Sequence, residues 1–215
     1  MEAVRKRAGP VHGVLVFAGL GLVVSGLLPL PWPLYLLLPL LIYAGIVLAT
    51  PSLRATAPRL AIGQTSGPAI AAAVALSLAT AAVLIAFHIL VHPDVSGFAV
   101  RLPVSGPLTL ICIGVFVSVV NALLEELIFR GIMWEVVAAE WNAGAALVVT
   151  AGVFGLFHLH GYPSGPLGVV LAGLYGLALG LLRWWTGGLA LAIACHVCAD
   201  ATIFSLLVRS GVFTS

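Results

Sequence analysis

Residues 121–131 read NALLEELIFRG, which places two glutamates and an arginine inside a stretch that is otherwise largely apolar. The rest of the chain is just as apolar: 62% of its 215 residues are hydrophobic, 7% are charged, and the mean hydropathy is +1.21. A soluble domain carries about 25% charged residues. This chain therefore has to face lipid. We predict an all-α, polytopic bundle of transmembrane helices that forms a single integral-membrane domain over residues 1–215.

Seven apolar runs are candidates for membrane spans, because a helix that crosses the hydrocarbon core needs about 20 apolar residues. We expect about seven spans, and between six and eight, at residues 14–30, 34–49, 68–91, 108–134, 143–159, 167–185 and 188–208. The second run is a little short. The segment between the second and third runs carries Arg54 and Arg59, and we predict that it lies at the membrane interface.

The basic residues predict how the chain is inserted, since Lys and Arg accumulate in cytoplasmic loops. A cytoplasmic N-terminus places six of them on the cytoplasmic side and two outside; the six are Arg5, Lys6, Arg7, Arg54, Arg59 and Arg183, and the two are Arg101 and Arg209. We therefore predict a multi-pass protein of the plasma (inner) membrane with its N-terminus in the cytoplasm. The net charge of +2 is too small to indicate a nucleic-acid partner.

Four ionisable residues lie inside the predicted spans: Glu125, Glu126, Arg130 and Asp200. A charge at the centre of a bilayer costs about 2.5–3.5 kcal/mol on insertion scales, so such groups face the bundle interior and are functional candidates. Glu126 and Arg130 are four residues apart on one helix face, and we expect them to pair. Glu125 is rotated by about 100° from Glu126 and has to face something else. The structural alternative is a buried ion cluster that only fixes how the helices pack.

A hairpin of the fourth and fifth spans brings a histidine to the depth of Glu125. If the hairpin turns near Asn142, Glu125 and His158 both lie about 25 Å from the turn. Phe154 is one turn before His158 on the same face. In the seventh span, His196 and Asp200 are four residues apart. Asp200 could accept a hydrogen bond from His196 and fix its tautomer, or it could bind a ligand.

These residues resemble the three motifs of the CAAX-protease-and-bacteriocin-processing family of intramembrane proteases, also called CPBP or Abi. The family pattern is Glu-Glu-x-x-x-Arg, then Phe-x-x-x-His, then His-x-x-x-Asn or Asp, each on its own transmembrane helix. The chain has EELIFR from Glu125, FGLFH ending at His158, and HVCAD from His196 to Asp200, in that order. The part that carries the motifs spans about residues 108–208.

The resemblance implies an intramembrane endopeptidase of the glutamate type. Glu125 and His158 would activate a water, and His196 with Asp200 would stabilise the oxyanion. Glu126 and Arg130, with Phe154 in support, would hold the scaffold or bind the substrate backbone. An ionised aspartate cannot donate to an oxyanion. Either Asp200 is protonated, or it orients His196 and His196 alone donates.

Other functions remain open on the sequence. Glu125, His158, His196 and Asp200 would also be acceptable zinc ligands, although the resemblance favours a mechanism with no metal or other cofactor. A proton-coupled transporter uses similar buried groups, and a non-catalytic binding or immunity protein could share the fold. The expected partners are the lipid bilayer and a protein or peptide substrate, whose identity the sequence does not select.

A ladder of small residues runs along the sixth span at four-residue spacing: Gly168, Ala172, Gly176 and Gly180. In lipid, such a ladder lets two helix backbones approach closely. We expect it to serve contacts between helices of one chain. A homodimer through the same face is the alternative.

Overall fold

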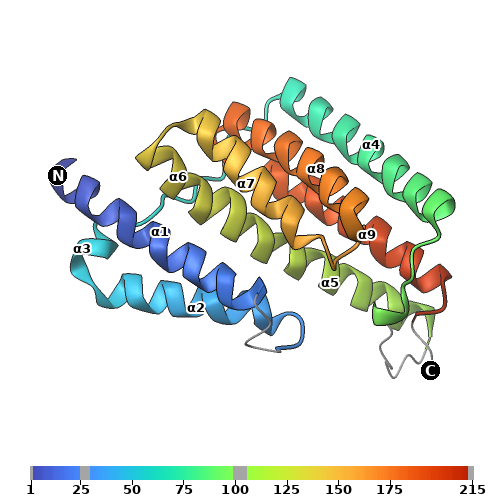
Figure 1. Cartoon of the computed structure of the whole chain (residues 1–215). Coiled ribbons are helices and arrows are strands. Elements are labelled where there is room, and N and C mark those ends of the chain that lie inside the picture. Colours follow the sequence, from blue (N-terminus) through green and yellow to red (C-terminus); the bar gives the residue numbers. More distant parts are fainter. Residues whose placement is uncertain (1, 25–29, 99–105, 213–215) are drawn as a thin grey trace.

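The computed structural model describes residues 2–24, 30–98 and 106–212, with side chains for residues 10–22 and for the two later ranges. These residues form helices with no strand among them, which confirms the all-α fold class (Figure 1). Four helical stretches are long and apolar enough to cross a membrane. They are α4 (Gly67–Val91), the continuous stretch Pro107–Glu140, α8 (Gly165–Thr186) and α9 (Ala190–Arg209). The chain is a polytopic helical membrane bundle.

Three predicted spans correspond to shorter apolar helices. They are the part Pro10–Leu22 of α1 (Glu2–Val24), α2 (Leu34–Ala49) and α7 (Ala143–Phe157). At 1.5 Å per residue, α2 and α7 reach only about 22–24 Å, whereas the hydrocarbon core is about 30 Å thick. The four long helices match four of the predicted spans by length and composition. A full crossing by the three shorter helices stays a prediction.

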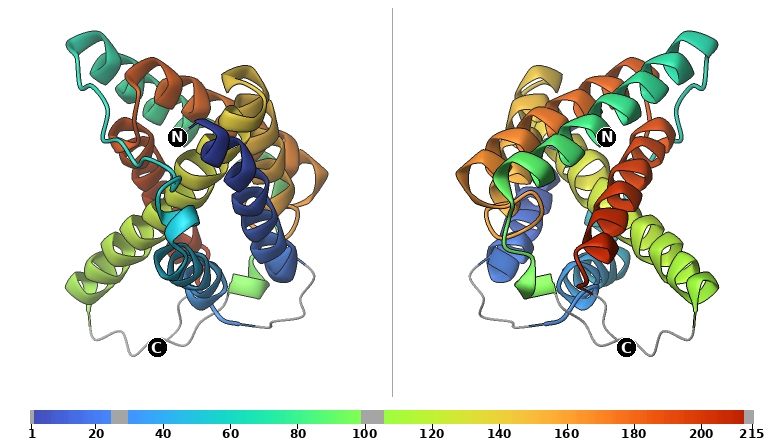
Figure 2. Two further views of the ribbon diagram at one scale, coloured as in Figure 1. Left: turned by 90° about the vertical axis from the view of Figure 1, so that its left-hand side faces the viewer. Right: turned by 90° about the vertical axis from the view of Figure 1, so that its right-hand side faces the viewer.

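The helices are arranged around the long stretch Pro107–Glu140. In Figure 1, α1 and α2 lie on one side of the bundle and α4 on the other, with α7, α8 and α9 between them. The hairpin turn is where the sequence predicts it, because Asn142 caps α7 by accepting a hydrogen bond from the N–H of Ala145 at 2.8 Å. The first part of the long stretch crosses α9, and α4 runs along α9 (Figure 2).

The segment with Arg54 and Arg59 forms the short helix α3 (Pro51–Arg54) and then irregular chain as far as α4. Its backbone pairs with the loop between α8 and α9: the N–H groups of Leu189 and Ala190 donate to the carbonyls of Ala61 and Ile62, both at 3.0 Å. The first N–H groups of a helix have no partner within the helix. This segment therefore caps the start of α9.

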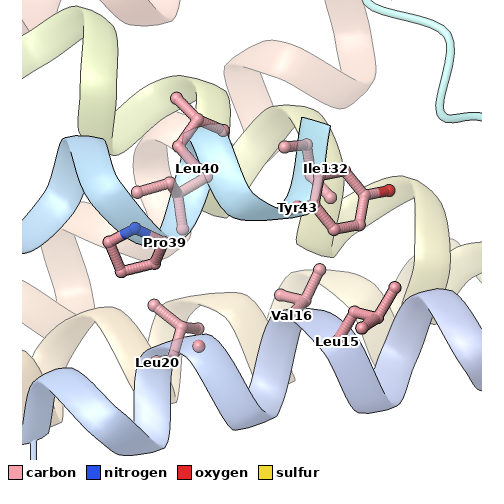
Figure 3. Close-up of a pocket in the computed structure, with 9 residues that line it drawn as sticks. Leu15, Val16, Leu20, Pro39, Leu40, Tyr43 and Ile132 are labelled. Atoms are coloured by element: carbon pink, nitrogen blue, oxygen red, sulfur yellow. The ribbon is translucent and has the colours of Figure 1, made fainter. Parts of the chain in front are cut away.

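A small apolar cavity of about 30 Å³ lies between α1 and α2 (Figure 3). Leu15 and Leu20 of α1 face Pro39 and Tyr43 of α2 across it, and Ile132 closes it from behind. Its lining is apolar apart from the tyrosine hydroxyl and includes no predicted site residue. The cavity belongs to the contact between the N-terminal helices and the long central stretch.

The small-residue ladder of α8 lies inside the chain. All four of its residues are buried, and the ladder contacts α7, the loop before α8 and the long central stretch Pro107–Glu140. A Cβ on Gly180 would lie 2.6 Å from Leu147 of α7, and one on Gly168 would lie 2.1 Å from the carbonyl oxygen of Pro163. The ladder serves the internal contact that we expected. A homodimer through the same face stays an untested alternative.

Few of the charges in the orientation argument can be followed in the structure. Arg183, one of the predicted cytoplasmic charges, is buried, with only 8% of it exposed. It pairs with Glu135, and its guanidinium lies 4.6 Å from the ring of Trp134. Arg101 lies outside the described residues, as do the side chains of Arg5, Lys6 and Arg7. A cytoplasmic N-terminus therefore stays a prediction.

Candidate active site

The first motif lies at a change of helix type that could not be predicted from the sequence. Helix α5 (Pro107–Glu126) continues as a π-helix, η2 (Leu127–Met133), and then as α6 (Trp134–Glu140). π-helices are rare and frequently occur at functional sites. The carbonyl oxygen of Arg130, inside η2, accepts a hydrogen bond from Nε of Arg183 at 2.7 Å. The buried Arg183 thus contributes to holding this segment of the long helix.

Glu126 accepts two hydrogen bonds through one carboxylate oxygen. Its Oε1 lies 2.6 Å from Nη1 of Arg130 and 2.7 Å from Nδ1 of His196, and neither Glu126 nor Arg130 is exposed. The Glu126–Arg130 pair predicted from the spacing is confirmed. Because an ionised carboxylate only accepts, Nδ1 of His196 carries the hydrogen. Glu126, and not Asp200 as we suggested, therefore fixes the tautomer of His196.

Arg130 is surrounded by protein on every side. Its Nη2 donates to the carbonyl of Gly176 on α8 at 3.3 Å, and its guanidinium lies 4.3 Å from the ring centre of Phe154 on α7. A Cβ on Gly176 would lie only 3.1 Å from Nη2, so a larger residue at this position would press on the buried Arg130. Neither Glu126 nor Arg130 has exposed surface. Of the two roles that the resemblance implies for the pair, this burial favours holding the scaffold, where the pair joins three elements.

Phe154 lies between the two site histidines. Its ring centre is 4.7 Å from that of His158 and 5.7 Å from that of His196. His158 follows the last residue of α7, and its Nδ1 donates to the carbonyl of Phe154 at 2.9 Å. In the neutral ring this hydrogen bond leaves Nε2 as an acceptor. His158 is thus set up to accept a proton or to orient a water.

Glu125 and Asp200 lie on either side of His196 without bonding to it. Nε2 of His196 is 3.6 Å from Oε2 of Glu125 and 3.8 Å from Oδ1 of Asp200, beyond hydrogen-bond range. Oε2 of Glu125 is buried and has no hydrogen-bond partner in the part of the chain that the structure describes. A buried acceptor without a partner is costly unless water or a ligand reaches it. The three side chains therefore frame a position for a small polar molecule.

Asn121 is a site residue that sequence reasoning missed. Its Nδ2 donates to Oε1 of Glu125 and to Oδ2 of Asp200, both at 3.2 Å. The available signal was its spacing of four residues before Glu125, in the same short stretch. Among the described residues, no hydrogen bond or ion pair joins the side chains of His158 and Glu125, although the hairpin was predicted to bring them to one depth.

A cavity of about 260 Å³ opens beside the histidines, between α4, α8 and α9. Phe154, His158, His196 and Asp200 line its polar end. The rest is mostly apolar and includes Leu76, Val83, Leu171, Leu174, Tyr175 and Ile203. The hydroxyl of Tyr175 is buried without a partner, and its ring lies edge-on to His196. Such a cavity suits an apolar group with a polar centre held against the histidines.

The arrangement of the acidic, histidine and cysteine side chains bears on whether the site could hold a metal ion. Within the part of the chain that the structure describes, no group of three or more His, Cys, Asp or Glu residues is placed to hold a metal ion. The four acidic and histidine residues that were considered as zinc ligands are thus not gathered as a ligand set. The mechanism without a metal remains a prediction.

The part of the chain that carries the motifs matches the model of a known family. The model of the Rce1-like family, described as type II CAAX prenyl endopeptidase Rce1-like, matches residues 107–202. The matched segment is slightly less than half of the chain and contains all three motifs and Asn121. No curated protein and no solved structure shows significant similarity to the chain. The resemblance predicted from the motifs is confirmed over the segment that carries them.

Proposed function

Because residues 107–202 match the Rce1-like family, we propose that this chain is an intramembrane endopeptidase that hydrolyses a peptide bond in a membrane-associated or peptide substrate. The match supports a CAAX-type protease in general. The observation that carries the finer proposal is the setting of His196: its Nε2 lies between the carboxyl groups of Glu125 and Asp200, at the polar end of an otherwise apolar cavity.

Glu125 is the general base of the proposed reaction. Its Oε2 has no hydrogen-bond partner among the described residues, so it is free to take a proton from a water placed between it and the substrate carbonyl. The hydroxide oxygen bonds to the carbonyl carbon while the carbonyl π bond breaks to give an oxyanion. Glu125 then returns the proton to the amine as the C–N bond breaks. General acid–base catalysis of this kind contributes about 10²–10⁴-fold in rate.

His158 assists by orienting the same water. Its Nδ1–H bond to Phe154 leaves Nε2 as the acceptor, and the ring lines the cavity with His196. Glu125 is bound to the protein through its other oxygen, so two side chains from different helices would position the water. This division of roles is the one that the family resemblance implies.

His196 supplies the donor for the oxyanion, with Nδ1–H held by Glu126 and a second hydrogen on Nε2. A preorganised donor at this position is worth roughly 3–4 kcal/mol. Of the two roles considered for Asp200, we propose that it does not donate. One of its oxygens already accepts from Asn121, and the other lies on the Nε2 side of His196, where a carboxylate favours the doubly protonated ring.

The cavity would take apolar side chains of the substrate next to the bond that is cut. Its walls come from α4, α8 and α9, and α4 has many large apolar side chains exposed on its outer face. The substrate would therefore approach within the membrane or as an extended peptide. We further propose that the protein resides in the plasma (inner) membrane with a cytoplasmic N-terminus and works without a metal.

The proposal is tested by comparing new peptide ends in membranes that contain the wild-type protein or Glu125→Gln. Terminal peptides are collected from both membranes and identified by mass spectrometry. The proposal expects new termini that appear with the wild type and are absent with Glu125→Gln, although both proteins are present in equal amounts. Identical sets of termini, with both proteins folded, would favour a binding protein or a transporter over a peptidase.

A further inference from the structure

The side-chain amide of Asn121 forms hydrogen bonds through both its nitrogen and its oxygen at the centre of the site. On α5 it lies four residues before Glu125, on the same helix face. Its two N–H groups point to Oε1 of Glu125 and Oδ2 of Asp200, and its Oδ1 accepts from Nε1 of Trp32 at 3.0 Å. One neutral side chain thus contacts both acids that flank His196.

Trp32 decides which way the amide of Asn121 faces. The indole N–H is a donor only, so the atom of Asn121 that faces it has to be the oxygen. Both amide hydrogens then point to the carboxyl groups on the other side. If Trp32 did not donate, the amide could rotate by half a turn and place its oxygen against a carboxylate, where it would repel.

The orientation of Asn121 leaves one free oxygen on each acid. Oε1 of Glu125 and Oδ2 of Asp200 are occupied by the amide, while Oε2 of Glu125 and Oδ1 of Asp200 face Nε2 of His196 at 3.6 and 3.8 Å. Two carboxylates that share one amide group and one imidazole nitrogen would repel each other unless donors held them. The amide supplies those donors and keeps the free oxygens directed at the histidine.

We infer that Asn121 is a positioning residue, oriented by Trp32, which holds Glu125 and Asp200 on either side of His196. The inference rests on the proposed peptidase function for its kinetic consequence but not for its geometry. Trp32 lies just before α2, outside the segment that matches the family. Its ring also stands edge-on to Phe116 of α5 at 6.4 Å. The N-terminal part of the chain therefore takes part in aligning the site.

The hydrogen bonds are tested directly by nuclear magnetic resonance. The chain has only two asparagines, Asn121 and Asn142. Protein labelled with ¹⁵N-asparagine in detergent micelles therefore gives two side-chain amide nitrogen signals. Asn142→Ser removes one of them and assigns the other. We expect Trp32→Phe and Asp200→Ala each to shift the Asn121 signal. Trp185→Phe, which changes a tryptophan that is 59% exposed, should leave it in place, and the Asn142 signal should not move in any of the three.

The kinetic consequence is tested with Asn121→Ala and Trp32→Phe. Misplacing catalytic groups by about 1 Å can cost about 100-fold in rate, so we expect kcat to fall about 10-fold to 100-fold, with KM unchanged because neither residue lines the cavity. Trp185→Phe is the matched control and should keep the wild-type kcat. Trp32→Phe decides the question if Asn121→Ala does not fold.

The two parts of the test fail separately. An Asn121 signal that stays in place in Trp32→Phe overturns the inferred orientation, whatever the enzymatic activity. A shifted signal with an unchanged kcat in Trp32→Phe refutes the positioning role. Absence of cleavage by the wild-type protein would refute the proposed function, while the amide signals would still decide whether Trp32, Asn121 and Asp200 form one chain of hydrogen bonds.

Discussion

Replacing Glu126 by glutamine should destabilise the protein strongly, and a second substitution should reverse that loss. Glu126→Gln keeps the shape of the side chain but removes the charge opposite Arg130, which lies 2.6 Å away and is not exposed. Breaking a buried ion pair by removing one partner costs about 3–5 kcal/mol. We expect about 3 kcal/mol here, because Arg130 keeps its contacts with Gly176 and Phe154.

The double variant Glu126→Gln/Arg130→Met removes both charges and should recover most of the stability, since replacing a whole buried pair is often neutral. The free energy of unfolding of the wild type, both single variants and the double variant is measured by denaturant titration in mixed micelles. The resulting cycle should give a coupling energy of about 3 kcal/mol. Single losses below about 0.5 kcal/mol that simply add up would refute the buried pair as a stabilising element.

The double variant also separates stability from catalysis. His196 donates through Nδ1 to the same oxygen of Glu126 that accepts from Arg130. A neutral glutamine supports a protonated imidazole less well than a carboxylate does. We therefore expect the double variant to be folded and stable, yet slower in cleavage than the wild type. Full activity in this variant would show that Glu126 has no part in preparing His196.

Three further outcomes are expected. Gly176→Ala should lower the free energy of unfolding by about 1–2 kcal/mol, because its Cβ would lie 3.1 Å from Nη2 of Arg130 and 3.2 Å from Cα of Ala151. Gly173→Ala is the control: the nearest neighbour of its Cβ is 3.8 Å away, so it should be neutral or stabilising in the same denaturant titration. Equal losses of stability in the two variants would contradict the reasoning. Ala178→Phe should raise KM about tenfold by filling the cavity that Ala178 lines. Val170→Phe, at a 56% exposed position of the same helix, should leave KM unchanged. A higher KM in both variants would contradict the role of the cavity in binding the substrate. The purified protein should keep its cleavage activity after chelation, and elemental analysis should find no stoichiometric metal in it. One zinc per chain, with activity lost on chelation and restored by zinc, would refute the metal-free mechanism.

The features that follow from periodicity and local spacing could be predicted from the sequence. Hydropathy located the long helices, and the turn residue Asn142 placed the hairpin. The pair Glu126–Arg130 needed only the geometry of one helix. Each of these depends on residues that are close together in the chain, where helix geometry alone decides which side chains meet.

The features that depend on how separate helices pack could not be predicted. The bond between Glu126 and His196 joins positions 70 residues apart, and helix geometry does not reveal which acid a histidine on another helix will contact. Arg183 lies near the end of an apolar run, where the sequence does not predict burial, yet a carboxylate and a carbonyl of the long central stretch satisfy it in the interior. The π-helical segment likewise has no local signal.

The central claim is that Glu125 activates the water, and the cleavage rate of purified protein in liposomes tests it most directly. The rates of wild type, Glu125→Gln, Glu126→Gln and the exposed control Glu140→Gln are compared on one substrate at equal amounts of folded protein. The account predicts that Glu125→Gln loses about 10²–10⁴-fold in rate, that Glu126→Gln keeps more activity than Glu125→Gln, and that Glu140→Gln is unaffected. Substantial cleavage by Glu125→Gln, or a greater loss in Glu126→Gln, would contradict the assignment of the base.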